Sequence, residues 1–315
     1  MHKRLAVGSR RLGIALAAVL VIDLAVLGTD VFLLSNRSAT TQVDLQDALV
    51  TYRSLGGAET VTSAPAGGVE VTALQDGPAP APTTASEAAP TTAVDAPTYT
   101  APSPTTTTAA GLVPPSEGVY SYRTTGGESI SVLSAHHDYP DTTYAAVRHT
   151  GGCGWQIRAE VVKEHLDERT MCSQPDRLLQ LTQSREVEFF GTRDGGTFAC
   201  EPPQVQFVVG DAAGAQTETD CGDGKGAMAH LVRTYLGTSH VSIGGVAVEV
   251  VKLRILGTLT GRVRGTSSDT LTLVASTGLP VRWERSVDSV ADAFGASVRY
   301  VEQASFDLTS LTPQT

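Results

Sequence analysis

The segment SAHHDYPDTTY contains the side chains best suited to acid–base chemistry or metal binding: His136, His137, Asp138 and Asp141, with His149 following. Imidazoles change charge near neutral pH and bind metals, so with carboxylates nearby they suit a metal site or a hydrolase. In an extended chain, however, neighbouring His136 and His137 point to opposite faces and cannot easily bind one ion. DYPD is also typical of a turn stiffened by its proline. We therefore interpret the segment as an exposed turn, with hydrolase chemistry as the weaker alternative.

Three further patterns that suggest chemistry have simpler structural interpretations. CGDGKGAM, around Lys225, lacks the GxxxxGK[ST] spacing of a phosphate-binding loop and is interpreted as a turn. Neither a GxSxG nucleophile elbow nor an HExxH zinc motif occurs in the sequence. Trp155 and Trp283 stand in strand-like segments, where tryptophan is more often a core anchor than a ligand platform. The sequence predicts no catalytic, cofactor-binding or metal-binding residue.

The four cysteines are the clearest structural signal. They are Cys153, Cys172, Cys200 and Cys221. No CxxC pair is present, which disfavours zinc and thiol–disulfide exchange. Three pairings are possible, and each sequential pair brackets a predicted hairpin whose open end brings the Cα atoms within bridging distance. We expect disulfides Cys153–Cys172 and Cys200–Cys221, which would place this part of the chain in an oxidising compartment.

Residues 12–34 form an apolar run after a basic flank, residues 1–11, that carries Lys3, Arg4, Arg10 and Arg11. As a helix the run is about 34 Å long, enough to cross a hydrocarbon core of about 30 Å. The basic flank should stay in the cytoplasm, which predicts a single-pass signal anchor with everything after it outside the cell. A cleaved signal peptide with an apolar region from Leu12 to Ile22 is the rival interpretation.

Asp23 and Asp30 lie within the predicted span, seven positions apart and therefore on one helix face. An ionisable residue in a membrane helix suggests contact with a partner helix. The simpler alternative is that Asp30 reaches the interface while Asp23 is tolerated. Inserting Asp23 into the membrane costs about 2.5–3.5 kcal/mol, which is less than the favourable insertion free energy of the apolar residues of the run.

Residues 35–57 are predicted to contain a short amphipathic helix next to the membrane. Thr41 followed by Asp44 resembles a capping box, and Gly56 with Gly57 would end the helix. One face carries Leu45, Ala48, Leu49, Tyr52 and Leu55. This helix could dock a partner, lie on the outer leaflet or continue the anchor helix, and the last is the preferred interpretation.

Residues 58–116 are dominated by Ala, Thr, Pro and Gly, with stretches such as PAPAPTTASEAAP. Such a segment cannot bury enough apolar surface to offset its chain entropy, so we expect a disordered linker. A tether of this kind after an anchor resembles bacterial envelope proteins that hold a domain away from the membrane.

Residues 117–315 are predicted to form one extracytoplasmic β domain. Segments such as GVYSYRTT, TTYAAVRHT, WQIRAEVV, VAVEVVKLRIL and LPVRWERS alternate with period two and are separated by glycine-rich turns. The expected fold is mainly β, a large antiparallel, half-barrel-like sheet with at most one or two short helices. SVDSVADAFGA, residues 286–296, is ambiguous, because Val287, Val290, Ala291 and Phe294 also fit a short helix.

The C-terminal region resembles the closing strands of LolA/LppX-type envelope carrier domains. The resemblance rests on LTGRVRGTSSDTLTLVASTGLPVRWERS and VRYVEQASFDLTSLTP, residues 259–286 and 298–313. It implies a half-barrel sheet that cups an acyl chain or a partner. The layout of anchor, Pro/Thr-rich tether and cysteine-bridged β domain also resembles bacterial single-pass envelope proteins.

Composition narrows the class of partner. The formal charge is −10 and no basic stripe is present, which argues against nucleic-acid binding. The leading hypothesis is a non-catalytic binding domain anchored in the bacterial cell membrane, whose ligand is an envelope lipid or protein; a structural scaffold is the alternative. An apolar cavity inside the sheet would favour a lipid, and a filled core with an exposed apolar patch would favour a protein.

Overall fold

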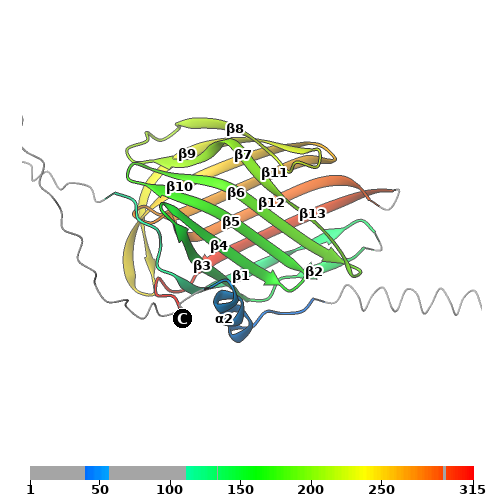
Figure 1. Ribbon diagram of the computed structural model, residues 1–315, viewed down its shortest axis with the longest axis horizontal. Helices are drawn as coiled ribbons and strands as arrows, with labels where there is room; N and C mark the ends of the chain where they lie inside the picture. Colours follow the sequence, from blue (N-terminus) through cyan, green and yellow to red (C-terminus); the bar gives the residue numbers. More distant parts are fainter. Residues whose placement is uncertain (1–39, 57–110, 133, 294–295) are drawn as a thin grey trace, which may run out of the picture. The chain divides into compact units, whose positions relative to one another are not determined.

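Thirteen β-strands and one helix make up the part of the chain that the structure describes (Figure 1). The structure is a computed structural model and describes residues 40–56, 111–132, 134–293 and 296–315. Its elements are α2 (Leu45–Ser54), β1 (Gly118–Ile130), β2 (His136–Asp138), β3 (Thr142–Gly151), β4 (Gly154–Val162), β5 (His165–Gln174), β6 (Arg177–Phe189), β7 (Thr192–Val208), β8 (Gln216–Gly222), β9 (Ala227–Ile243), β10 (Val246–Gly261), β11 (Val263–Val274), β12 (Pro280–Ala293) and β13 (Ala296–Leu308).

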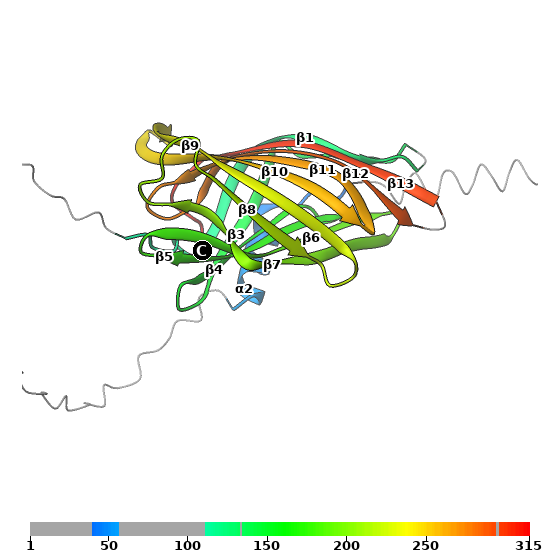
Figure 2. The same cartoon turned by 90° about the horizontal axis from the view of Figure 1, so that it is seen from above.

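All the strands belong to one antiparallel sheet that follows the chain order from β3 to β13. β1 closes this sheet into a ring, because it pairs with β3 along one half and with β13 along most of its length. Figure 2 shows β1 and β10–β13 on one side of the ring and β3–β7 on the other. The predicted mainly β fold is confirmed, and the β1–β13 pairing makes the sheet more closed than the expected half-barrel.

Alternate side chains of each strand face the interior of the ring, as a period of two requires. On β13, for example, Glu302, Ala304, Phe306 and Leu308 are buried while Gln303 is exposed. An apolar core fills the interior towards one end, and its largest fully buried side chains are Trp155, Tyr120, Phe207, Leu178, Leu253, Leu271 and Leu273. Trp155 and Trp283 both pack in this core, as the sequence suggests.

Both predicted disulfides are present, Cys153–Cys172 and Cys200–Cys221. The first joins the open end of the β4–β5 hairpin, where Gly154 is opposite Cys172. The second joins β7 to β8, and Cys200 is directly opposite Cys221. Paired strands therefore bring each pair of thiols together, which is the reason for the sequential pairing.

Helix α2 is shorter than the segment predicted to contain it, and it begins differently. Asp44 is the N-cap residue and accepts a hydrogen bond from the backbone N–H of Asp47 at 2.8 Å, so the expected Thr41 cap is wrong. Residues 40–44 are not helical, so within them α2 does not continue a preceding helix. The helix ends next to Gly56, whose φ is +82°, as the sequence predicts.

The apolar face of α2 packs on the outer face of the sheet. Ala48, Leu49 and Tyr52 are buried in a small cluster with Val119 of β1 and Ala146 of β3. The residues before the helix are also bound: the Thr41 carbonyl accepts from the Lys163 backbone N–H at 2.9 Å, and Thr41 N–H donates to Glu164 at 2.9 Å. This helix is therefore part of the β domain, and not one of the three placements expected for it.

Several expectations are corrected or lie outside the described residues. Residues 280–293 form strand β12, so the short-helix alternative is wrong there. Strand β9 lies in a segment that the period-two pattern did not mark. The predicted span 12–34, with Asp23 and Asp30, and most of the predicted linker lie outside the described residues. Within the described part of the chain, none of the helices is both long and apolar enough to cross a membrane.

Candidate functional site

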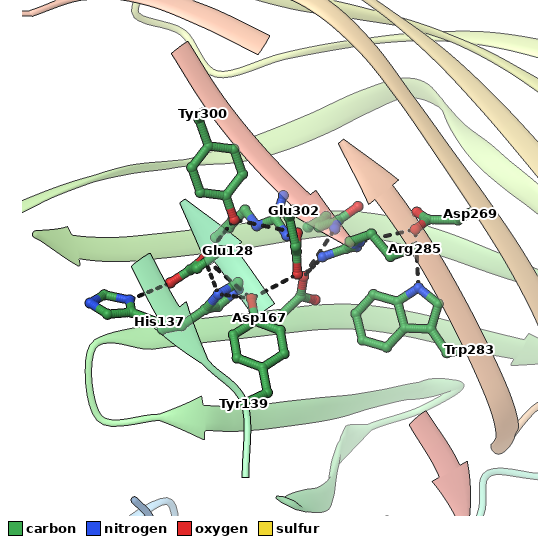
Figure 3. A network of polar contacts seen from close by, with 12 residues as sticks. Glu128, His137, Tyr139, Asp167, Asp269, Trp283, Arg285, Tyr300 and Glu302 are labelled. Carbon is green, nitrogen blue, oxygen red and sulfur yellow. Dashed lines mark hydrogen bonds and ion pairs between the residues drawn. The ribbon is translucent and has the colours of Figure 1, made fainter. Parts of the chain in front are cut away.

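A layer of charged and aromatic side chains, here called the polar layer, crosses the interior of the ring beyond the apolar core (Figure 3). It draws on seven strands, β1, β2, β5, β6, β11, β12 and β13, and on the segment that follows β2. Its members are Glu128, His137, Tyr139, His165, Asp167, Arg169, Arg185, Asp269, Trp283, Arg285, Tyr300 and Glu302. Strand β5 alone supplies His165, Asp167 and Arg169, which face inward because they alternate along it.

Arg285 is held between two carboxylates. Asp269 is its direct neighbour across β11 and β12, and Arg285 Nε donates to Asp269 Oδ1 at 2.9 Å. Its Nη1 donates to Asp167 on the far side of the interior. Trp283 Nε1 also donates to Asp269 Oδ1, at 3.0 Å. Burial alone would lower the pKa of Arg285, but the attraction of Asp167 and Asp269 outweighs it and raises that pKa well above its ordinary value.

The pKa values of the carboxyl partners of Arg285 shift in the opposite direction. Burial raises the pKa of Asp167 and of Asp269, but attraction to Arg285 and then Arg169 is stronger, so both pKa values are lowered. Both groups are therefore carboxylates at neutral pH. A pair of buried carboxylates is stable here because two guanidinium groups lie against them.

Arg169 forms ion pairs along one edge of its guanidinium group but makes no hydrogen bond there to any described residue. Its Nε lies 3.6 Å from Asp167 Oδ1 and its Nη2 lies 3.6 Å from Asp269 Oδ2, beyond ordinary hydrogen-bond distance. The guanidinium carbon lies 4.1 Å from the centre of the Trp283 ring, and that of Arg285 lies at the same distance from that ring. Burial lowers the pKa of Arg169 more than the attraction of Asp167 and Asp269 raises it.

Glu128 joins two imidazoles at the other side of the layer. Its Oε1 accepts from His137 Nδ1 and its Oε2 from His165 Nδ1, each at 2.7 Å. The Tyr300 hydroxyl donates to Glu128 Oε2 at 2.6 Å. Burial raises the pKa of Glu128, but attraction to His165 and hydrogen bonds from His137, His165 and Tyr300 lower it below its usual range.

Glu302 connects this group with Arg185. It lies directly opposite Glu128 on β13, accepts from the Tyr139 hydroxyl at 3.0 Å and is paired with Arg185. Arg185 is itself directly opposite Asp167 across β5 and β6. Burial lowers the pKa of Arg185, but the attraction of Glu302 outweighs this and raises it. The layer therefore contains two networks of hydrogen bonds and ion pairs, one around Glu128 and Glu302 and one around Arg285.

A cavity of about 500 Å³ lies on the side of the polar layer away from the apolar core. This volume is within the range of about 300–1,000 Å³ that is typical of small-molecule sites. Apolar side chains form most of its wall: Ile130, Val132, Val187, Phe189, Phe190, Phe198, Leu231, Ile255, Leu259, Val263, Val287 and Val298. The floor is polar, with Arg169, Arg185 and Arg285 beside Gln180 and Gln204.

The candidate residues of SAHHDYPDTTY separate in the structure. His136 and Asp138 are exposed, whereas His137 is buried in the polar layer, so the two histidines do point to opposite faces. The turn interpretation is right for exposed Asp141. His149 lies elsewhere, where its Nε2 is 2.8 Å from the Pro115 carbonyl. Lys225 lies in the β8–β9 connection, where its N–H donates to Asp223.

The structure does not bring these residues into a metal or catalytic constellation. Among the described residues there is no group of three or more His, Cys, Asp or Glu side chains placed to hold a metal ion. Neither His137 nor His165 is among the residues that line the cavity. The cavity can therefore bind and orient a ligand through arginines and glutamines, without an imidazole beside it.

Most residues of the polar layer were not identified from the sequence. The segment HLDERT lies in strand β5, and the turn before it is confined to Lys163 and Glu164. The available signal was the alternation of His165, Asp167 and Arg169, three charged or polar residues at every second position of a strand. Such a pattern normally marks an exposed face, and only the closure of the ring turns it inward.

Comparison with known proteins adds no family to this description. The scan against family models, the search of curated proteins and the search of solved structures each gave no match. The C-terminal resemblance to LolA/LppX-type domains therefore stays a prediction from the sequence.

Proposed function

We propose that this protein is an extracytoplasmic binding domain of the cell envelope that holds a lipid-like ligand inside its ring of strands. The observation that carries the proposal is the apolar cavity of about 500 Å³ bounded by the polar layer. A wall of phenylalanine and aliphatic side chains favours a hydrocarbon chain, because each buried CH₂ contributes about 0.8 kcal/mol. The proposed role is binding and not catalysis.

The proposed location rests on the disulfides and on the N-terminal sequence. Two disulfides are typical of a domain outside the cytoplasm. The apolar run 12–34 is proposed to anchor the chain in the bacterial cell membrane by one span, with the β domain outside. Asp23 and Asp30 would then be the positions for contact with a partner helix.

Lipid extraction from the purified protein tests this function. The full chain is purified from its own membrane as wild type, as Ala291→Trp on the cavity wall and as Ala247→Trp on the exposed surface. Mass spectrometry should find a stoichiometric acyl-chain compound in the wild type and in Ala247→Trp, but not in Ala291→Trp. Equal lipid in all three proteins, or none in the wild type, would contradict the proposal.

A further inference from the structure

In the described part of the chain, the buried polar side-chain atoms of the cavity lining that have no hydrogen-bond partner are all donors. Among the described residues that line the cavity, the buried side-chain nitrogen and oxygen atoms without a hydrogen-bond partner are Arg169 Nε and Nη2, Arg185 Nε, Gln204 Nε2 and Arg262 Nε. All five are N–H donors. A buried donor without a partner is unfavourable, so a ligand that offers acceptors would remove this cost.

Arg169 provides the best-shaped part of this donor set. Its side chain is only 7 % exposed, and Nε and Nη2 lie on one edge of the guanidinium group. Two parallel N–H groups on such an edge match the two oxygens of a carboxylate. The nearest acids are Asp167, whose Oδ1 lies 3.6 Å from Nε, and Asp269, whose Oδ2 lies 3.6 Å from Nη2. Each accepts a hydrogen bond from Arg285 through its other oxygen.

The other arginines of the cavity indicate which way a ligand would lie. Arg193 and Arg262 are close to the β6–β7 and β10–β11 turns and have carboxylate partners, Glu186 and Asp223, each at 3.2 Å. More N–H groups of the described residues therefore lack a hydrogen-bond partner at the floor, beside the polar layer, than at the rim, beside these turns. From Arg185, the inward-facing positions of β6 continue with Val187 and Phe189 towards the turn.

We propose, on the basis of the proposed function, that the ligand is a single-chain fatty acid. Its carboxylate lies against Arg169, Arg185 and Gln204, and its hydrocarbon chain runs along Val187 and Phe189 towards the rim. The charge of the lining agrees with an anion: five arginines and three aspartates line the cavity, although the whole chain has a formal charge of −10.

The test compares probes that have the same hydrocarbon chain and differ in their headgroups. The full-length protein, kept soluble without detergent by a peptide scaffold, is loaded with the dye Nile red. It is then titrated with dodecanoate, methyl dodecanoate or dodecyltrimethylammonium. The Ala291→Trp variant measures displacement that does not come from the cavity. Dodecanoate should bind at least about tenfold more tightly than the ester, because hydrogen bonds to a charged group contribute more than neutral ones. The cationic probe should bind most weakly.

Two variants and a control test where the carboxylate headgroup of the fatty acid lies. Arg169→Gln should lower the affinity for dodecanoate by at least about tenfold and change the affinity for the ester by less than about twofold. Gln204→Leu should lower the affinity for dodecanoate by a smaller factor. Arg193→Gln, which changes a cavity arginine at the rim, should leave the preference for dodecanoate intact. If Arg169→Gln does not fold, Gln204→Leu and the wild-type probe series still decide the outcome.

The outcomes separate this inference from the proposed function. Binding of all three probes with equal affinity, or tighter binding of the ester or the cation, would overturn the fatty-acid assignment while leaving chain binding in place. An unchanged preference in both Arg169→Gln and Gln204→Leu would overturn the placement of the head. Failure of every probe to displace Nile red from the wild type would contradict the proposed function itself.

Discussion

Cys200 and Cys221 lie directly opposite each other on β7 and β8, with their Cα atoms 4.0 Å apart. Within the described residues, the only other residue pair that joins these two strands is Ala199 with Gly222. The disulfide is therefore a covalent link at the junction where the ring has the least backbone pairing. By contrast, Cys153–Cys172 links a hairpin that is paired along its length.

Removal of the two disulfides should have unequal effects. The sequence separations are 19 and 21 residues, so loop entropy assigns each about 3 kcal/mol. Replacing Cys200 and Cys221 with alanine should cost more than this, because the β7–β8 junction then opens in the native state. Urea unfolding and amide hydrogen exchange measure the difference. Equal losses for both double variants, with unchanged exchange in β7 and β8, would show that the second bridge does not hold the ring closed.

Arg285→Met should destabilise the domain by about 3–5 kcal/mol, because it leaves Asp167 and Asp269 buried without their shared cation. Arg282→Met is the matched control on the same strand. Arg282 is 52 % exposed and pairs with Glu284 on the outer face, so its loss should cost less than about 1 kcal/mol. Denaturant unfolding of both variants at neutral pH gives the comparison. A similar, small cost for the two would mean that the polar layer does not stabilise the fold.

Acid should destabilise the domain at a pH set by the buried carboxyls. The pKa values of Glu128, Asp167 and Asp269 are lowered in the folded state, while unfolded carboxyls titrate near pH 4. Below that pH the unfolded chain binds more protons than the folded one, so the stability present above about pH 5 is lost as pH falls. Each such carboxyl contributes a slope of about 1.4 kcal/mol per pH unit.

Urea midpoints between neutral pH and pH 3 measure this slope. The decrease should be steeper than one carboxyl can produce, since three groups shift in the same direction. A free energy of unfolding that stays constant down to pH 3 would contradict the assignment of these groups as ionised partners.

Helix α2 should hold the β domain even when the chain between them is cut. A protease site inserted between residues 57 and 110 allows this cleavage, and the N-terminal fragment should then copurify with residues 111–315. Tyr52, 2 % exposed, is a main anchor of α2, so Tyr52→Ala should weaken the association by about a hundredfold or more. Val50→Ala, at a side chain that is 62 % exposed, is the control.

Membrane fractionation after the same cleavage extends the test to the proposed anchor. The β domain should stay with the membrane in the wild type and in Val50→Ala, and should be released in Tyr52→Ala. Complete release of the wild-type domain would show that the contacts of α2 are too weak to hold it.

The sequence was sufficient for the class of fold and for the covalent links. Period-two alternation identified the strand around Leu253, because it has one buried and one exposed face. It also identified the strands around Tyr120 and Ala145, although α2 covers part of their outer face. The disulfides were predicted from hairpin geometry, which is local. The hairpin is present for β4 and β5, whereas, among the described residues, β7 and β8 pair only beside Cys200 and Cys221. The same local reasoning found the apolar face of α2, although it could not show that this face packs on Val119, because that contact joins segments separated by the linker.

The polar layer could not be predicted in the same way, because its contacts are long-range. Arg285 and Asp167 are 118 positions apart, and Tyr139 and Glu302 are 163 apart. Which inward-facing positions meet depends on the register of every strand between them. Without that register, a charged residue at alternate positions of a strand indicates a solvated face, and the cavity lined by Arg169 has no signature of its own.

Photo-crosslinking tests most directly whether the cavity is the ligand site. A fatty acid with a diazirine near the end of its chain is bound to the full protein, irradiated, and mapped by peptide mass spectrometry. We expect labels on cavity-wall residues such as Phe189, Phe198 and Val287, and loss of these labels in Ala291→Trp. Labels confined to exposed apolar residues such as Leu236 and Leu256, unaffected by Ala291→Trp, would contradict a ligand site inside the ring.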